Sequence, residues 1–248
     1  MLDFGFYNAD CMDGMKEFPD KYFDLAIVDP PYGGVTQGGY MNNNISGGVA
    51  KHRPYHNAIW NQRKPDAEYF RELRRVSKDQ IIWGANYFTT SIFDDSQCWI
   101  VWDKNKGEGI QFADVELAYT SFDQASKIFH YTWNGMLQGD MKNKEHKIHP
   151  TQKPVALYKW LLSRYMPEGG VLLDTHVGSA SSLIACREMG FKYVGFEIDP
   201  VYYKKAKERL DAAVAQGNIF DFIEKPQEQV TIDEWLNNDS NTRPDTTP

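Results

Sequence analysis

The sequence LLDTHVGSASS at residues 172–182 decides the fold class. A short apolar run passes into small residues and then into a helical pattern that continues to residue 189, which predicts a strand, a tight turn and a helix. Gly190 stands where a left-handed helix end is usual. Further along, VGFE at residues 194–197 predicts a second strand that ends in an acid. Together these segments predict a βαβ unit and therefore an α/β fold with a parallel sheet.

The turn of this unit has the chemistry of a nucleotide site. Small residues such as Gly178 and Ser179 let a ligand approach the backbone, and N–H groups at a helix start suit a carboxylate or phosphate. Glu197 stands where an acid accepts hydrogen bonds from ribose hydroxyls. The turn lacks the three glycines of the dinucleotide fingerprint, which favours a nucleoside with a small zwitterion over NAD. Any α/β protein could carry such a turn, so the unit alone leaves the function open.

A second polar group follows another apolar run far upstream. The sequence DPPY at residues 29–32 comes directly after residues 25–28, which predict a short buried strand. Ligands of open α/β sheets bind at this edge. Proline lacks an N–H and cannot continue a ladder, so the carbonyls of Asp29 and Pro30 are free to accept hydrogen bonds. A planar amine lying against Tyr32 would suit both acceptors, although a solvated Asp in a Pro-Pro turn is an equally simple interpretation.

The rest of the chain alternates strands and helices. We expect strands near residues 4–7, 80–83, 98–102 and 115–122, and helices near residues 10–18, 68–76, 154–165 and 200–215. The stretch 33–48 is rich in Gly and Asn and predicts a long loop. Because it follows the DPPY sequence, we interpret it as a mobile lid, with a passive linker as the alternative.

Composition indicates a soluble protein of one sizeable domain, or one domain with an inserted lobe. The chain has 248 residues, 42% of them hydrophobic and 25% charged. No apolar run approaches the length of a membrane span, and the first residues lack a secretory signal pattern. The three cysteines are far apart, which favours reduced thiols in the cytoplasm and no metal site.

The net charge of −7 is concentrated at the end of the chain. From residue 221 onward, seven acidic and two basic residues account for −5 of it, and this tail is predicted to be partly disordered. The stretches 51–64 and 142–153 are locally basic and could form a stripe for nucleic acid on a nearly neutral body. A solvated charged surface is the alternative.

The order of these motifs resembles one enzyme family. With HPTQKP at residues 149–154 between them, the DPPY sequence and the βαβ unit resemble the amino-methylating DNA methyltransferases that use S-adenosylmethionine, in particular their permuted β-class group. Asn8-Ala9-Asp10, residues 83–88 and residues 116–120 resemble further motifs, so the resemblance covers roughly residues 1–215. It implies a Rossmann-like methyltransferase fold, circularly permuted, with a mostly parallel seven-stranded sheet. It further implies one domain at residues 1–220, a recognition insertion at about 123–147, a mobile loop at about 33–60 and an acidic tail at 221–248.

The resemblance also implies roles for individual residues. Asp29, Pro30 and Tyr32 would be catalytic: the carboxylate and the Pro30 carbonyl would accept from the target amine, and Tyr32 would stack on a base flipped out of the duplex. The cofactor would be bound by Asp10 at its adenine, Glu197 at its ribose, Gly178 and Ser179 beneath its methionine part, and by Asp29, Asp174, His149 and Lys153. Among these, Asp174 would hold the loop shape and Lys153 would lie close to the methionine carboxylate. For Lys153 a surface lysine, and for His149 a packing histidine, are the simpler interpretations.

The cofactor loop departs from the usual family sequence Asp-Pro-Phe-x-Gly-Ser-Gly-Thr. Thr175 and His176 replace Pro and Phe, and Ala180 replaces the second Gly. His176 could still lie flat beside the cofactor, and Ala180 restricts the turn only modestly.

The implied activity is methyl transfer from S-adenosylmethionine to the N6 amine of adenine in double-stranded DNA. Asp at the first position of the tetrapeptide favours adenine-N6 over cytosine-N4. The cytosine-N4 enzyme, an RNA or protein amine methyltransferase, and a non-catalytic DNA- or cofactor-binding homologue remain alternatives. We expect a stand-alone cytoplasmic modification enzyme of a bacterial or phage-infected cell, with no membrane association, and a homodimer is possible.

Overall fold

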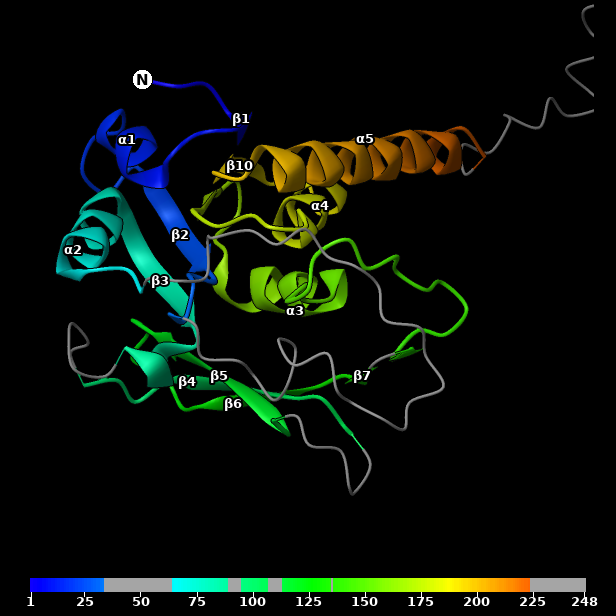
Figure 1. Ribbon diagram of the computed structural model, residues 1–248, viewed down its shortest axis with the longest axis horizontal. Helices are drawn as coiled ribbons and strands as arrows, with labels where there is room; N and C mark the ends of the chain where they lie inside the picture. The colour runs from blue at the N-terminus through cyan, green and yellow to red at the C-terminus, as the bar shows by residue number, and fades with distance from the viewer. Residues whose placement is uncertain (34–63, 89–94, 107–112, 135, 224–248) are drawn as a thin grey trace, which may run out of the picture.

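A computed structural model describes residues 1–33, 64–88, 95–106, 113–134 and 136–223. Helices and strands alternate in the first and last parts of the chain, whereas β4 to β8 follow one another without a described helix between them. The strands form one large sheet and one small hairpin (Figure 1). The strands are β1 (Gly5–Tyr7), β2 (Phe23–Val28), β3 (Ser77–Trp83), β4 (Trp99–Asp103), β5 (Val115–Thr120), β6 (Lys127–His130), β7 (Trp133–Asn134), β8 (Leu137–Gln138), β9 (Val171–Asp174) and β10 (Lys192–Phe196). The helices are α1 (Cys11–Lys16), α2 (Ala67–Val76), the 3₁₀ helix η2 (Ala85–Tyr87), α3 (Val155–Tyr165), α4 (Ser181–Glu188) and α5 (Pro200–Ile223).

The large sheet confirms the predicted α/β class. Its strand order is β1-β10-β9-β2-β3-β5-β4-β6. The first five strands are mutually parallel, β5 is antiparallel to both of its neighbours, and β6 is parallel to β4. The sheet therefore has eight strands where seven were expected. The additional strand β6 is an edge strand with three exposed side chains, so it lacks the apolar pattern by which a strand is found in a sequence.

Helices cover both faces of the parallel half of the sheet (Figure 1). In β2, Leu25 and Ile27 belong to the core that also contains residues of α3 and α4. Ala26 and Val28 point to the other face and join the core that contains residues of α1 and α2. Because both faces are buried, β2 is a continuous apolar run and not an alternating one.

Strands from distant parts of the sequence are neighbours at the centre of this sheet. β2 pairs in parallel with β9, in the register Leu25↔Leu172 and Ala26↔Leu173. Their carboxyl ends, which carry the two polar groups of the sequence, therefore lie side by side. Chain connections leave β9 and β2 in opposite directions here, which is where open α/β sheets bind their ligands.

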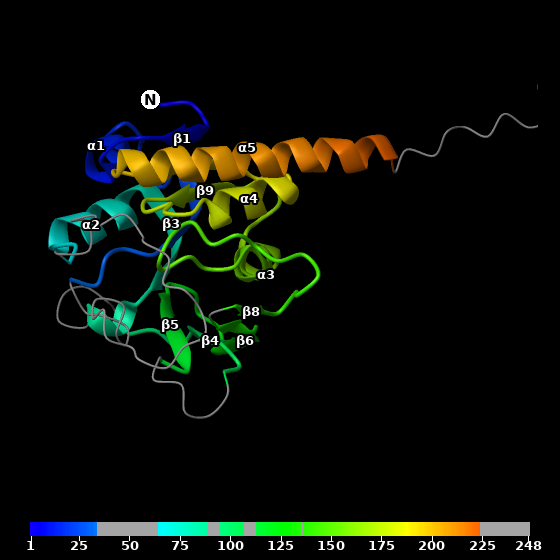
Figure 2. The ribbon, with the colours of Figure 1, turned by 45° about the vertical axis from the view of Figure 1, so that its right-hand side comes forward.

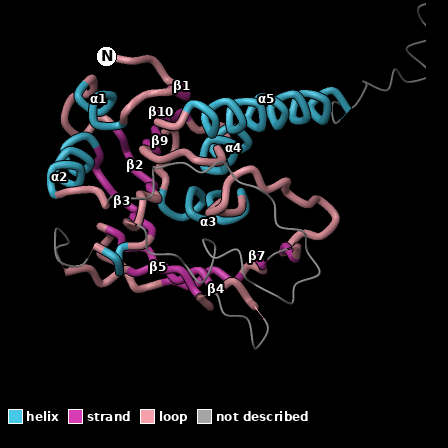
Figure 3. Tube along the Cα trace, viewed as in Figure 1, coloured by secondary structure: helices cyan, strands magenta, loops and turns pink. Residues whose placement is uncertain are grey.

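The last described helix is longer than the sequence predicts. α5 continues to Ile223, beyond the expected end at residue 215, and it extends past the sheet (Figure 2). Before α3, by contrast, residues 139–154 contain neither helix nor strand, and they form the long loop between β8 and α3 (Figure 3).

Several predictions concern residues outside the described ranges. These are the mobile loop at 33–60 except for Gly33, the basic stretch 51–64 except for Lys64, and residues 224–248 of the acidic tail. The segment 123–147, predicted as a recognition insertion, contains β6 of the large sheet and the β7–β8 hairpin. The division into domain, insertion and tail stays a prediction. Among the described helices, none combines the length and the apolar character needed to cross a membrane.

Candidate active site

The DPPY sequence and the HPTQKP sequence meet at the carboxyl end of β2. The Tyr32 hydroxyl donates to Oδ1 of Asp29 over 2.5 Å. The Lys153 ammonium donates to the other carboxylate oxygen, Oδ2. Asp29 is thus held at both oxygens by side chains from two separate motifs, which fixes the direction of its remaining lone pairs.

Lys153 belongs to a buried row of alternating charges. Its side chain is 3% exposed and also lies 3.1 Å from Oε2 of Glu116, which in turn pairs with Lys104 over 2.6 Å. Burial alone would lower the pKa of Lys153, but attraction by Asp29 and Glu116 outweighs it and raises the pKa. Burial would likewise raise the pKa of Glu116, but Lys153 and Lys104 hold it at about 2. Lys153 and Glu116 therefore both stay charged at neutral pH.

Tyr32 is packed on its ring as well as hydrogen-bonded. Tyr87 of η2 stacks on it with ring centroids 4.8 Å apart and an interplanar angle of 24°. Gly84, which precedes η2, has φ of +68°, and a Cβ there would overlap the Tyr32 ring. Only glycine satisfies both the left-handed backbone and this close approach. The backbone before η2 therefore helps to fix the orientation of Tyr32.

The loop after β9 is shaped by Asp174. Its Oδ1 accepts from the His176 N–H over 3.0 Å, and its Oδ2 accepts from the Ser182 hydroxyl over 2.5 Å. The side chain is buried, and this burial raises its pKa to about 7. Asp174 therefore ties the start of the loop to the first turn of α4.

Two residues of this loop have left-handed backbone conformations. Gly178 has φ of +56°, and Ala180, the residue before α4, has φ of +62°. Glycine adopts this region freely, whereas a Cβ makes it costly. The departure at Ala180 therefore falls on a position where the backbone favours glycine.

Glu197 joins the loop to β1 and β10. Its carboxylate accepts from the N–H groups of Gly178 and Asp199, each over 2.9 Å. The Asn8 amide donates to the Glu197 carbonyl over 2.7 Å, which brings the Asn8-Ala9-Asp10 sequence to the same place. Asp10 begins α1 there, and its side chain accepts from the Met12 N–H over 2.8 Å.

His149 packs against the same turn from the other side. Its ring lies 3.7 Å from the position that a Cβ on Gly178 would take, and it makes an edge contact with Tyr202 at 4.3 Å between centroids. Burial lowers its pKa to about 3, so the ring is neutral at physiological pH. His149 is therefore buried and packs against the turn at Gly178.

His176 makes its contacts with Thr175 and with Tyr69 of α2. Its Nδ1 lies 2.9 Å from the Thr175 hydroxyl, which also pairs with the Tyr69 hydroxyl at 2.7 Å. The His176 ring meets the Tyr69 ring edge-on, at 5.5 Å between centroids. Burial lowers its pKa to about 4. The two substituted loop residues thus form a hydrogen-bonded group with α2.

Sequence reasoning missed several residues of this region, chiefly Lys104, Glu116 and Tyr69. One signal was available for Glu116, because a single acid in the otherwise uncharged strand 115–120 must be paired if that strand is buried. No comparable signal identifies Lys104 or Tyr69, since both meet their partners only through the fold.

Known proteins resemble the chain in both sequence and fold. Residues 99–208 match a family model described as DNA methylase. The type II methyltransferase M.HpaI of Haemophilus parainfluenzae is 25% identical over 251 residues, which covers 88% of this chain and 76% of that protein. The type II methyltransferase M2.DpnII of Streptococcus pneumoniae is 25% identical over 208 residues, with 79% and 67% covered.

Two solved structures share the architecture. The complex of M1.HpyAVI with SAM aligns with a TM-score of 0.51 at 19% identity, covering 82% of this chain and 98% of that one. The cytosine-N4-specific PvuII DNA methyltransferase aligns with a TM-score of 0.54 at 11% identity, covering 86% and 91%. At these identities the likeness establishes the fold, which is the Rossmann-like methyltransferase fold. The family model and the two relatives support the resemblance to the DNA amino-methyltransferases that the sequence motifs indicate.

Proposed function

We propose that this protein transfers a methyl group from S-adenosylmethionine to the N6 amine of an adenine flipped out of double-stranded DNA. The observation that carries the proposal is the position of Asp29. Its carboxylate is held by Tyr32 and Lys153 at the end of β2, directly beside the loop that follows β9. A fixed acceptor for an amine thus lies next to a nucleoside-type turn.

The residues around this turn fit S-adenosylmethionine. The Glu197 carboxylate caps the Gly178 N–H at the end of β10, and Asp10 lies at the start of α1 nearby, so acceptors for a ribose and an adenine amine are present. The left-handed turn at Gly178 leaves room above the backbone, since a Cβ placed on this residue would find its nearest neighbour, His149, at 3.7 Å. When bound, the cofactor would supply an electrophilic methyl group. Lys153 would contact the methionine carboxylate while its ammonium group stays paired with Asp29 and Glu116.

Asp29 and Pro30 supply the chemistry at the amine. The lone pair of an exocyclic amine is delocalised into the base, which makes it a poor nucleophile. Hydrogen bonds from its two N–H groups to the Asp29 carboxylate and the Pro30 carbonyl favour a pyramidal nitrogen whose lone pair is available. Because Lys153 and Tyr32 hold the carboxylate in advance, little reorganisation is needed during the reaction.

A base bound in this way takes the place of Tyr87. In the structure Tyr87 stacks on Tyr32, a residue that is only 8% exposed. We propose that the flipped base displaces the Tyr87 ring and stacks on Tyr32 instead, which exchanges one aromatic contact for another.

Labelled methyl transfer tests the proposal directly. The protein is incubated with methyl-labelled S-adenosylmethionine and either duplex DNA or RNA, and the product is digested to nucleosides. We expect the label in N6-methyladenine from DNA only. Label in N4-methylcytosine would overturn the choice of base, and label in RNA would overturn the choice of substrate. Cofactor binding without transfer to any substrate would leave the protein as a non-catalytic homologue.

A further inference from the structure

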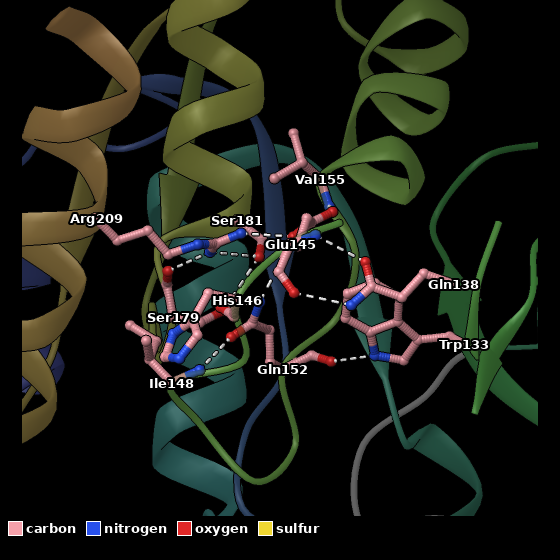
Figure 4. Close-up of polar contacts among 10 residues, drawn as sticks. All are labelled: Trp133, Gln138, Glu145, His146, Ile148, Gln152, Val155, Ser179, Ser181 and Arg209. Atoms are coloured by element: carbon pink, nitrogen blue, oxygen red, sulfur yellow. Dashed lines mark hydrogen bonds and ion pairs between the residues drawn. The ribbon is translucent and has the colours of Figure 1, made fainter. Parts of the chain in front are cut away.

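A buried ion pair outside the reacting groups connects the loop before α3 with the cofactor loop. Nη2 of Arg209, on α5, lies 2.5 Å from Oε2 of Glu145 (Figure 4). The two side chains are only 14% and 18% exposed. Neither residue belongs to the motifs that identify the family in this sequence, so their pairing needs another explanation.

Arg209 holds the cofactor loop through its other nitrogen. Nη1 donates to the Ser179 carbonyl over 2.5 Å and to the Ser181 hydroxyl over 3.0 Å. These residues flank Ala180, the non-glycine residue in a left-handed conformation. A planar guanidinium that bonds on both sides of this residue fixes the path of the turn, and a lysine could not reproduce its geometry.

Glu145 anchors the guanidinium to the segment before α3. Its Oε1 accepts from the Val155 N–H over 2.9 Å, and it thereby caps α3, for which the preceding Pro154 provides no side-chain hydrogen bond. Its backbone N–H and carbonyl are both bonded to the Gln138 side chain over 2.8 Å. Glu145 is therefore fixed by β8 on one side and by α3 on the other (Figure 4).

Gln152 completes the connection to the HPTQKP sequence. Its Oε1 accepts from the Ile148 N–H over 2.9 Å, and its carbonyl accepts from the Trp133 indole N–H over 2.8 Å. The side chain neighbours Glu145 as well, since its Nε2 lies 3.5 Å from Oε2. The loop that carries His149 and Lys153 is thus bonded to the β7–β8 hairpin and, through Glu145, to α5.

We infer that Arg209 is a positioning residue for the cofactor loop and that Glu145 holds it in place. The segment from β8 to α3 and the turn at Ser179 are thereby kept in one arrangement. This inference rests on the proposed function, because it names residues that shape the S-adenosylmethionine site without touching the reacting atoms.

Direct binding and steady-state kinetics test the inference in variants of the full chain. Arg209→Lys keeps the charge but loses the planar fork, and Glu145→Gln keeps an acceptor for Val155 but loses the charge. We expect each to raise the dissociation constant for S-adenosylmethionine, measured by calorimetry, by about tenfold, since a charge-assisted hydrogen bond to the loop is weakened. The KM for S-adenosylmethionine should rise in parallel while kcat changes little.

Lys207→Met is the matched control, since it removes an exposed i,i+4 pair with Asp211 from the same helix. It should leave the dissociation constant unchanged. The double variant of Glu145 and Arg209 should bind no more weakly than the weaker single variant, because both substitutions break one connection. Thermal unfolding of the ligand-free proteins separates a loss of fold from a loss of binding.

The outcomes distinguish this inference from the proposed function. If the wild-type protein does not bind S-adenosylmethionine, the proposed function fails. If it binds, but folded Arg209→Lys and Glu145→Gln bind as tightly as wild type, the positioning role is wrong. Equal effects of Lys207→Met would also overturn it, and so would fully additive losses in the double variant.

Discussion

The two halves of the site are held in place by different forces. At the end of β2, Asp29 is fixed by charge, through Lys153 and onward to Glu116 and Lys104. At the end of β9, the loop turns through left-handed backbone conformations at Gly178 and Ala180, and its charged contact, Arg209, bonds to the residues on either side of Ala180 from outside the loop. Asp174 contributes there as a hydrogen-bond acceptor and not as a member of an ion pair.

This difference predicts which changes each half tolerates. Removing one charge from the row around Asp29 leaves its partners buried and uncompensated, which is expensive. At Gly178 and Ala180, the atom that a Gly/Ala exchange adds or removes is a Cβ, and its effect on stability is limited to the strain of one residue. A substitution that removes a charge but keeps the size of the side chain should therefore lower stability strongly at the end of β2. A substitution that adds or removes a single methyl group should change stability only weakly in the loop after β9.

Asp29→Ala should have the largest effect, and its effect should be on catalysis. The variant removes the acceptor for the target amine, so we expect transfer to fall by at least about 10³-fold. Binding of S-adenosylmethionine should survive, because the turn at Gly178 and Glu197 is untouched. Labelled transfer and calorimetry on the same preparation measure both quantities. Full activity in this variant would remove Asp29 from the mechanism.

Lys153→Met should damage both folding and activity. It leaves Asp29 and Glu116 without their shared cation, so we expect a loss of about 3 kcal/mol in the free energy of unfolding. Transfer should fall because the carboxylate of Asp29 is no longer held. Urea unfolding measures the first effect, with Lys78→Met as the control. Lys78 forms an exposed pair with Asp24, and its loss should change stability by less than about 1 kcal/mol. Equal losses in the two variants would contradict a special role for the buried row.

The sequence predicted this site unevenly, for physical reasons. Parallel strands buried on both faces leave a clear apolar signal, so the positions of Asp29 and Asp174 at strand ends could be predicted from it. The pairing of Lys153 with Glu116 and Lys104 could not be predicted, because Lys153 precedes α3, Glu116 lies in β5 and Lys104 follows β4, and only the fold brings these segments together. Likewise, β6 has exposed faces and leaves no pattern, and the left-handed conformation of Ala180 is invisible in a residue that usually prefers helices.

Asp174→Asn should change how stability depends on pH. The pKa of Asp174 is raised to about 7 by burial, whereas in the unfolded chain it is about 4. The folded state therefore holds this proton more tightly, and the contribution of Asp174 to stability is fully present below pH 4 and is lost as the pH rises toward 7. Asparagine does not titrate, so the variant should lack this loss.

The free energy of unfolding is measured for wild type and for Asp174→Asn at several pH values between about pH 5 and pH 8, a range that brackets the raised pKa. The difference between the two proteins is then compared across these pH values. This range lies above the region in which Glu116, with a pKa of about 2, loses its own stabilising contribution. The wild type should lose stability relative to the variant as the pH rises. A difference that stays constant over this range would show that Asp174 is already ionised in the folded protein.

The smallest effects are expected for the two left-handed residues of the loop, and they should have opposite signs. Gly178→Ala adds a Cβ where φ is +56° and the nearest atom is 3.7 Å away, so strain without a clash should cost about 1 kcal/mol. Ala180→Gly relieves the same strain, but it also removes a buried methyl group and frees the unfolded chain, so any gain should stay below about 1 kcal/mol. Urea midpoints at equal slope measure both variants. A loss of more than about 2 kcal/mol for either one would mean that the loop depends on side-chain packing as much as on backbone conformation, and the contrast with the charged half of the site would then fail.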